Sequence, residues 1–413
     1  MVMRAARLAL VLGAALGCGD RRTPAAEPPN LARLEATVDS LMPRLQVLAG
    51  LQKRGEIGMQ LQNRDSLRRY IETQMAEELP DTELASIQAT YEALGLIPAN
   101  LDLKALLLEL YTEQVAGYYD PATKKLYVVT GADPETLRPT LVHELVHALQ
   151  DQHTNLDSLI ARERGNDRQT AAQAAIEGHA TMVMFAFLAE QQTKSPVDLR
   201  TLPDISAQVR PAMEAQNDQF PVFQRAPRIL RETLLFPYVD GAGFVQKLWL
   251  RPLQTGFGDP YPAPLGERLP GSTEQVMHPE RFMAERDEPT ELQFGPAASP
   301  VVRENTLGEF ETSILLVEHL GREAGSLARG WDGDRYRLIE TAGARVLLWY
   351  SVWDSDEAAD RFADAYRQIA QKRGRSTRVQ RITIDDRPGI EVVDAPAGTD
   401  PTRIPLPTVT IAR

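Results

Sequence analysis

Two histidines and a glutamate with the spacing HExxH stand in the stretch TLVHELVHALQDQH, which runs from Thr140 to His153. His143 and His147 are four residues apart, so on an α-helix both imidazoles leave the same face, one turn from each other. Two nitrogens placed in this way can hold one Zn²⁺ ion, and a neighbouring glutamate can take a proton from a water molecule at the metal. The stretch therefore predicts a zinc site with Glu144 as general base. Two core histidines and a solvent-exposed glutamate are the alternative explanation.

A hydrolytic zinc site needs a third protein ligand and one coordination position left for water. Glu177 is the first candidate, because a carboxylate in the apolar segment AAIEGHAT is costly unless it is paired or bound to a cation. A buried ion pair with arginine or histidine is its alternative role. His153 is the second candidate, because it follows His143 by ten residues, as in the pattern HExxHxxGxxH. Gln150 replaces the glycine of that pattern, and a straight helix turns His153 away from the ligand face, so Glu177 is favoured.

Hydrolysis at a carbonyl carbon would also need a donor to the oxyanion of the tetrahedral intermediate. Tyr238 in LLFPYVDG and His278 in STEQVMHPE are candidates, because each offers a hydrogen-bond donor downstream of the predicted ligands. Either could instead be an ordinary core or surface residue. His179 follows Glu177 by two residues and points about 200° away from it on a helix, so we expect it either to be structural or to support a metal ligand without binding the metal. Asp151 could orient the second imidazole, although a solvated helix end is the simpler role.

The elements around these residues must bring them together. Residues 31–116 have apolar side chains at three- and four-residue spacing, which predicts a helical scaffold. The segment AGYYDPATKKLYVVTG then predicts a β-hairpin whose second strand runs from Lys125 to Thr130, where zinc peptidases place the edge that pairs with an extended substrate. The helix with HExxH follows, beginning between Asp133 and Pro139. A second, largely apolar helix spans 168–192.

The pattern changes again at about Asn305, where a helix, two strand-like segments, a helix and two more strand-like segments follow one another. This order predicts a separate α+β domain. We therefore expect an α+β chain with two domains. A mainly helical catalytic domain with a small edge sheet occupies residues 31–300, and a C-terminal α+β domain occupies residues 301–413.

The first residues, MVMRAARLALVLGAALGCGD, combine two arginines, a short apolar run and the only cysteine of the chain, Cys18. This order is typical of a secretion signal, and AALGC is similar to the bacterial lipobox, whose cysteine carries a lipid. We expect a signal peptide at residues 1–17, a lipid on Cys18 that anchors the protein to the cell envelope, and a tether at residues 18–30. Plain secretion is the alternative. The net charge of −12 argues against a nucleic acid partner.

The motif HELVHALQDQH, preceded by EQVAGYYDPATKKLYV and followed by IEGHAT, resembles the gluzincin class of zinc metallopeptidases. Within this class it is similar to a group of secreted or lipid-anchored bacterial proteins, over residues 31–282. The resemblance implies a zincin-like catalytic domain in which His143, His147 and Glu177 bind zinc and Glu144 is the general base. The ExxxD continuation of thermolysin-like members is absent, because Thr181 stands four residues after Glu177.

The resemblance thus implies zinc-dependent hydrolysis of peptide or protein substrates in the cell envelope or outside the cell. A non-catalytic envelope lipoprotein that uses zinc only to brace two helices is the alternative, and its site would be closed by a fourth protein ligand. An extracytoplasmic metal carrier is a third possibility. It would need weak, exchangeable binding, and we rank it last.

Overall fold

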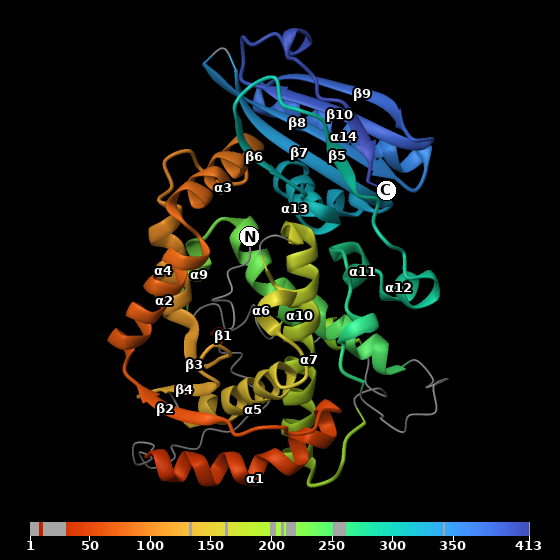
Figure 1. The fold of residues 1–413 in the computed structure, drawn as a ribbon. Coiled ribbons are helices and arrows are strands. Elements are labelled where there is room, and N and C mark those ends of the chain that lie inside the picture. Colours follow the sequence, from red (N-terminus) through yellow and green to blue (C-terminus); the bar gives the residue numbers. More distant parts are fainter. Residues whose placement is uncertain are drawn as a thin grey trace.

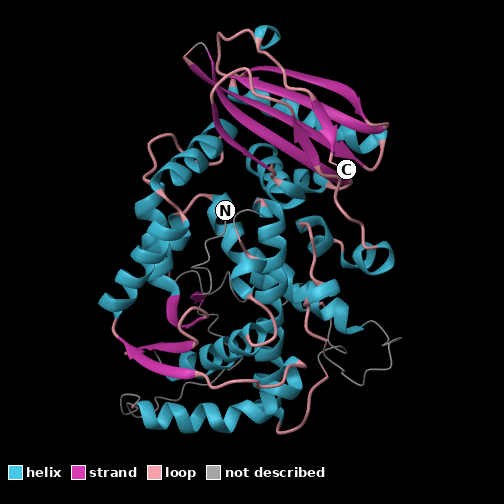
Figure 2. Cartoon of the chain, viewed as in Figure 1, coloured by secondary structure: helices cyan, strands magenta, loops and turns pink. Residues whose placement is uncertain are grey.

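The computed structural model of the protein describes residues 8–10, 30–131, 134–161, 164–198, 204–207, 210–211, 220–250, 262–341 and 343–412. This part of the chain has an α+β fold, as the sequence predicts (Figures 1 and 2). A helical body carries a small sheet, and a larger sheet forms the C-terminal part. Of the predicted signal peptide and tether, only 8–10 and Asn30 are among the described residues, and Cys18 lies outside them.

The scaffold predicted for residues 31–116 consists of α1 (Leu31–Ala49), α2 (Arg64–Glu78), α3 (Asp81–Leu94) and α4 (Leu103–Gln114). The side chains of Asn30, Asn63 and Asp102 accept hydrogen bonds from backbone N–H groups three residues on, which caps α1, α2 and α4. Gly50 and Gly95, both with positive φ, end α1 and α3. The helical periodicity of residues 31–116 does not predict the strand β2 (Gly58–Gln62), which depends on a distant strand, β4, for its backbone partner.

A four-stranded sheet in the order β1-β3-β4-β2 lies beside these helices. It contains β1 (Leu8–Leu10), β3 (Val115–Asp120), β4 (Lys125–Val129) and β2. The predicted hairpin is confirmed: β3 and β4 pair, and Asp120 Oδ1 accepts the N–H of Ala122 at 3.0 Å in the turn between them. The prediction that the second strand forms the edge is wrong, because β4 pairs with β3 on one side and with β2 on the other. The outer side of β3 faces β1 instead.

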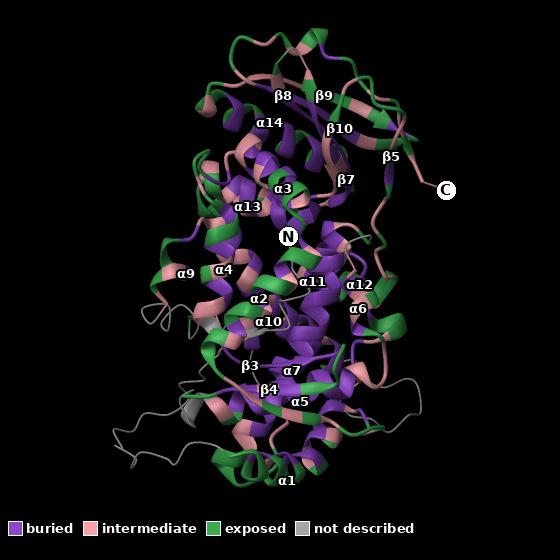
Figure 3. Ribbon diagram, turned by 60° about the vertical axis from the view of Figure 1, so that its left-hand side comes forward, coloured by how far each residue is buried: buried purple, intermediate pink, exposed green. Residues whose placement is uncertain are grey.

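The helices that carry the predicted site residues pack against each other and against β3. α5 (Pro134–Asp151) holds HExxH and contacts β3, α1 and α7. α7 (Asn166–Thr193) holds Glu177, and α10 (Arg228–Leu250) holds Tyr238. The short α6 (Leu156–Leu159) lies in the connection from α5 to α7. α7 is buried along most of its length because α1, α5, α10 and α13 surround it, as its apolar sequence predicts (Figure 3).

Glycines set the distance between α7 and α10. A Cβ on Gly178 would lie 2.1 Å from the backbone carbon of Gly241, and a Cβ on Gly241 would lie 2.1 Å from the carbonyl oxygen of Ala174. Side-chain carbons cannot approach other atoms so closely, so this backbone contact requires glycine on both helices. Gly178 follows Glu177, and Gly241 lies about one turn after Tyr238. The contact therefore fixes where Tyr238 lies relative to Glu177.

Helix α9 (Pro221–Arg225) precedes α10 and packs on α4 in the helical body. Helices α11 (Thr273–Met277) and α12 (Pro279–Glu285) lie between α10 and the C-terminal part in the chain. The C-terminal sheet has five strands in the order β6-β7-β8-β10-β9, and all of its pairs are antiparallel. Its strands are β6 (Val301–Asn305), β7 (Trp331–Thr341), β8 (Ala344–Trp353), β9 (Ser376–Ile384) and β10 (Arg387–Ala395). Two helices, α13 (Gly308–Leu320) and α14 (Asp356–Arg373), belong to this part. The pair β5 (Leu292–Phe294) and β11 (Val409–Ile411) packs beside it around a small second core.

Helix α13 joins the C-terminal part to the helical body. It contacts α7, α10 and α11 of the body as well as α14 and β7 of the C-terminal part. Phe310 of α13 stacks on Phe236 of α10 with ring centroids 4.0 Å apart, and the Tyr91 hydroxyl of α3 donates to Glu311 Oε1 at 2.8 Å. The C-terminal part thus has the predicted α+β composition, but its main core is continuous with that of the body.

We predict that Gly178→Ala lowers the free energy of unfolding by about 1–3 kcal/mol, because the added methyl group forces α7 and α10 apart. Urea denaturation followed by circular dichroism measures the change. Gly243→Ala on α10 is the matched control, since a Cβ there would meet Ser206 at an ordinary 3.4 Å and alanine favours helices. Equal stabilities of the two variants would contradict the proposed backbone contact.

Candidate metal centre

The histidines of HExxH and Glu177 point toward one another from α5 and α7. Nε2 of His147 lies 3.0 Å from Nε2 of His143 and 3.2 Å from Oε2 of Glu177. Nε2 of His143 lies 3.0 Å from the same carboxylate oxygen. Each of these side chains belongs to a residue that is at most 4% exposed. The three atoms form a nearly equilateral triangle in the protein interior.

This triangle fits a metal ion in size and in chemistry. Ligand atoms of a tetrahedral zinc ion, each about 2.0–2.1 Å from the metal, are about 3.3–3.4 Å apart, so the observed separations need widen by only a few tenths of an ångström. Each atom can present a lone pair, and buried acceptors that face one another are unfavourable unless a cation lies among them. Glu144 also brings a carboxylate oxygen within 4.8 Å of the two imidazoles. The cluster can therefore hold a metal ion.

Gln150 orients the second imidazole, a role that the sequence analysis did not assign. His147 Nδ1 lies 2.8 Å from Gln150 Oε1, while Gln150 Nε2 lies 3.0 Å from the carbonyl oxygen of Ile176. Because a carbonyl only accepts, the amide NH₂ must face Ile176, and Oε1 then accepts the proton of His147 Nδ1. This leaves the Nε2 lone pair of neutral His147 directed at the cluster. Gln150 lies three residues after His147, a spacing that places both on neighbouring faces of a helix and could have indicated the contact.

His179 extends this network to α1. Its Nδ1 lies 3.0 Å from Gln150 Nε2, and its Nε2 lies 3.1 Å from the carbonyl oxygen of Ala49. Burial lowers the pKa of His179 to about 3, so the ring is neutral and donates from Nε2 to Ala49. The structural role expected for His179 is consistent with these contacts. Backbone and side-chain groups from α1, α5 and α7 thus fix the amide that orients His147.

Burial and neighbouring charges have opposite effects on the pKa values of Glu177 and His147. Burial raises the pKa of Glu177, but the charges and hydrogen bonds of His147 and His143 outweigh it and lower this pKa to about 2. Burial lowers the pKa of His147, but the carboxylates of Glu177 and Glu144 raise it to about 9. Burial lowers the pKa of His143. A proton on the imidazoles therefore balances the charge of Glu177, and a bound metal ion would replace that proton.

Glu144 is fully buried, and β3 holds it in place. Its Oε2 accepts the backbone N–H of Tyr119 at 2.6 Å. The Tyr119 hydroxyl in turn donates to Asp151 Oδ2 at 2.9 Å, and Lys124 Nζ donates to the same oxygen at 2.6 Å. Asp151 therefore links the β3–β4 hairpin to the end of α5 through hydrogen bonds. Gln150, and not Asp151, contacts the ring of His147. Glu144 is placed beside the cluster by both its helix and this strand.

Of the other predicted site residues, Tyr238 lies near the cluster, whereas His278 and His153 have their contacts elsewhere. The ring of Tyr238 lies 5.9 Å from that of His143, centroid to centroid, and Tyr238 is 2% exposed. His278 instead pairs with Glu309 of α13 at 2.9 Å. His153 Nε2 contacts the carbonyl oxygen of Gln52 at 2.8 Å. The structure thus brings Tyr238 to the predicted ligands but not His278 or His153.

The space beside the cluster is small. A cavity of about 10 Å³, which is room for about one water molecule, opens next to His147 and Glu177. Its other lining residues are Tyr119, Pro121, Leu156, Ile160, Gln173 and Ile176. Most of these are apolar. In this structure the cluster is closed off by its own neighbours.

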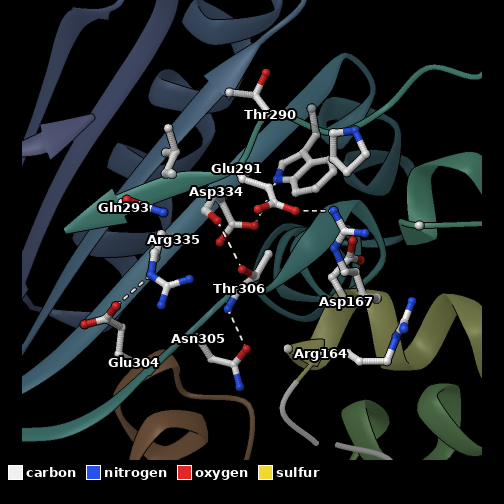
Figure 4. Close-up of a pocket in the computed structure, with 16 residues that line it drawn as sticks. Arg164, Asp167, Thr290, Glu291, Gln293, Glu304, Asn305, Thr306, Asp334 and Arg335 are labelled. Atoms are coloured by element: carbon white, nitrogen blue, oxygen red, sulfur yellow. Dashed lines mark hydrogen bonds and ion pairs between the residues drawn. The ribbon is translucent and has the colours of Figure 1, made fainter. Parts of the chain in front are cut away.

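A larger cavity of about 400 Å³ lies between the start of α7 and the C-terminal sheet (Figure 4). Two ion pairs lie on its wall: Arg335 Nε donates to Glu304 Oε1 at 2.7 Å, and Arg168 pairs with Glu291. Asp167 on its wall precedes Glu177 by ten residues, which is about 15 Å along the helix. The larger cavity is therefore separate from the metal cluster.

Comparisons with known proteins bear on the C-terminal part alone. Residues 299–400 match a family model described as a domain of unknown function, DUF8575. This match covers the C-terminal sheet with α13 and α14 and leaves His143, His147 and Glu177 outside it. No curated protein and no solved structure matches the chain.

Among the described residues, no helix has the length and apolar character that a membrane crossing requires.

We predict that Glu177→Ala weakens metal binding by more than about 100-fold, because it removes one of three converging donors. His153→Ala should leave the affinity unchanged, since His153 contacts a backbone carbonyl away from the cluster. Competition with a chromophoric chelator measures both affinities. The opposite pair of results would make His153 the third ligand.

We predict that Gln150→Leu weakens metal binding by about 10–100-fold, because His147 loses the acceptor that orients its ring. The same chelator titration applies, and circular dichroism checks that the variant is folded. Asp151→Asn on the same helix turn is the control, because Asp151 contacts Tyr119 and Lys124 rather than a histidine. Unchanged affinity of Gln150→Leu would contradict the role of this amide.

Proposed function

We propose that this protein is a zinc metallopeptidase, with His143, His147 and Glu177 as the zinc ligands. The observation that carries the proposal is the convergence of two imidazole nitrogens and one carboxylate oxygen within 3.0–3.2 Å of one another. Zinc bound by three protein ligands keeps one position open, polarises a carbonyl and lowers the pKa of water. The neutral form of His147, oriented by Gln150, supplies the donor nitrogen that zinc prefers. Hydrolysis of a peptide bond is the reaction that this set of groups supports best.

The residues around the cluster take the remaining roles. Glu144 accepts a proton from the attacking water and passes it to the departing amine. Its hydrogen bond to the N–H of Tyr119 restrains the carboxylate so that one oxygen stays turned to the strand. Tyr238 is the candidate donor to the carbonyl oxygen of the substrate, because it lies against His143 and carries a hydroxyl.

The place of action is proposed from the first residues of the chain. Residues 1–17 act as the signal peptide, and a lipid on Cys18 anchors the protein to the cell envelope, with secretion as the alternative. The backbone of Leu8–Leu10 pairs with the outer side of β3. Removal of the signal peptide would leave this side of β3 available to an extended peptide, which binds sheet edges through its own backbone. β3 would then present the substrate beside Glu144.

A zinc-braced, non-catalytic lipoprotein is the second candidate, and the burial of the cluster favours it. Such a site needs a fourth protein ligand, and Glu144 is the residue that could supply it, since its carboxylate lies within 4.8 Å of the imidazoles. The two proposals therefore assign different roles to the same side chain. A general base is dispensable for metal affinity, whereas a fourth ligand is not.

We predict that Glu144→Gln keeps its zinc and loses at least about 10³-fold in kcat, because an amide cannot accept the proton. The measurement uses the protein from Cys18 onward, a peptide library read by mass spectrometry, and zinc analysis of both variants. A chelator should abolish cleavage by the unaltered protein, and added zinc should restore it. Cleavage that resists the chelator or survives in Glu144→Gln would contradict the peptidase. Loss of zinc from Glu144→Gln would favour the structural site.

A further inference from the structure

Gln173 is a buried side chain on the face of α7 that carries Glu177, and its carbonyl oxygen has no hydrogen-bond partner among the described residues. It precedes Glu177 by four residues, so the two side chains leave the same face of the helix, one turn apart. Gln173 is 4% exposed, and none of the described residues donates a hydrogen bond to its Oε1. An unsatisfied buried carbonyl is unfavourable for folding. A position that keeps such a group beside a metal cluster is a candidate for binding a ligand.

The side chain of Gln173 lies on the wall of the small cavity beside His147 and Glu177. Gln173 lines this cavity together with His147 and Glu177, and the remaining wall is formed by Tyr119, Pro121, Leu156, Ile160 and Ile176. The cavity therefore combines a largely apolar wall, one amide and the face of the metal cluster. Its volume of about 10 Å³ has room for one water molecule or for a group of similar size.

We propose that this cavity is a substrate subsite in which Gln173 accepts a hydrogen bond from a small hydroxyl side chain. The substrate class is a peptide with serine or threonine next to the scissile bond; this inference rests on the proposed peptidase function. A hydroxyl matches the size of the cavity and gives the amide oxygen the donor that it lacks. Gln173 is thus a specificity-determining residue and not a zinc ligand.

A neighbouring glutamine provides a matched control on the same helix. Gln169 lies one turn before Gln173 and is also buried, but its Nε2 donates to the carbonyl oxygen of Ile160 at 3.0 Å. Replacing Gln169 by leucine breaks a hydrogen bond, whereas replacing Gln173 by leucine removes an unsatisfied oxygen. The two substitutions should therefore change stability in opposite directions.

The experiment compares the zinc-loaded protein from Cys18 onward with its Gln173→Leu and Gln169→Leu variants. Substrates are peptide pairs that differ only by serine or alanine beside the bond that the library identifies. The unaltered protein should prefer serine by about tenfold in kcat/KM, and Gln173→Leu should reduce this preference to less than about twofold. Gln173→Met, which matches the length of glutamine, should behave like Gln173→Leu. Gln169→Leu should keep the preference.

Thermal unfolding gives a second readout that does not depend on catalysis. Gln173→Leu should raise the unfolding midpoint with and without zinc, and Gln169→Leu should lower it. Zinc affinity should be the same in the Gln173 variants and the unaltered protein. An unchanged serine preference, a lowered midpoint in both Gln173 variants or weakened zinc binding would overturn the inference. Failure of the unaltered protein to cleave any peptide would instead overturn the peptidase proposal, and this inference with it.

Discussion

A buried carboxylate that faces two imidazoles needs a positive charge among them. Glu177 lies within 3.0–3.2 Å of the nitrogens of His143 and His147, in a region that solvent does not reach. Water cannot stabilise the carboxylate there, so either a proton or a metal ion must do so. Two helices have to be held at a fixed separation for this arrangement to exist, and the surrounding elements supply that restraint.

The restraint comes from both sides of α7. On one side, the amide of Gln150 links α5 to the Ile176 carbonyl and, through His179, to the end of α1. On the other side, Gly178 and Gly241 bring α7 and α10 into backbone contact. Neither set of contacts includes a proposed metal ligand other than His147. These interactions hold the three proposed ligands in position without a metal ion, as a preorganised site requires.

The sequence predicted the parts of this arrangement that depend on local periodicity. The i, i+4 spacing of HExxH, the apolar helix around Glu177 and the hairpin before α5 all follow from short-range patterns, and the structure contains each of them. It did not predict β2, because a five-residue strand paired with β4 depends on a partner more than sixty residues away. It also missed the role of Gln150, whose partners include a backbone carbonyl on another helix. The prediction that His278 belongs to the site is not supported, because its hydrogen-bond partner, Glu309, comes from α13.

The position of α13 has a consequence for how the chain loses its structure. This helix packs on the helical body with one side and on the C-terminal sheet with the other, inside a core that continues across both. Heating should therefore melt the two parts in one cooperative transition rather than in sequence. A shortened chain that ends before residue 301 would expose the apolar surface that α13 covers on α10 and would be prone to aggregate.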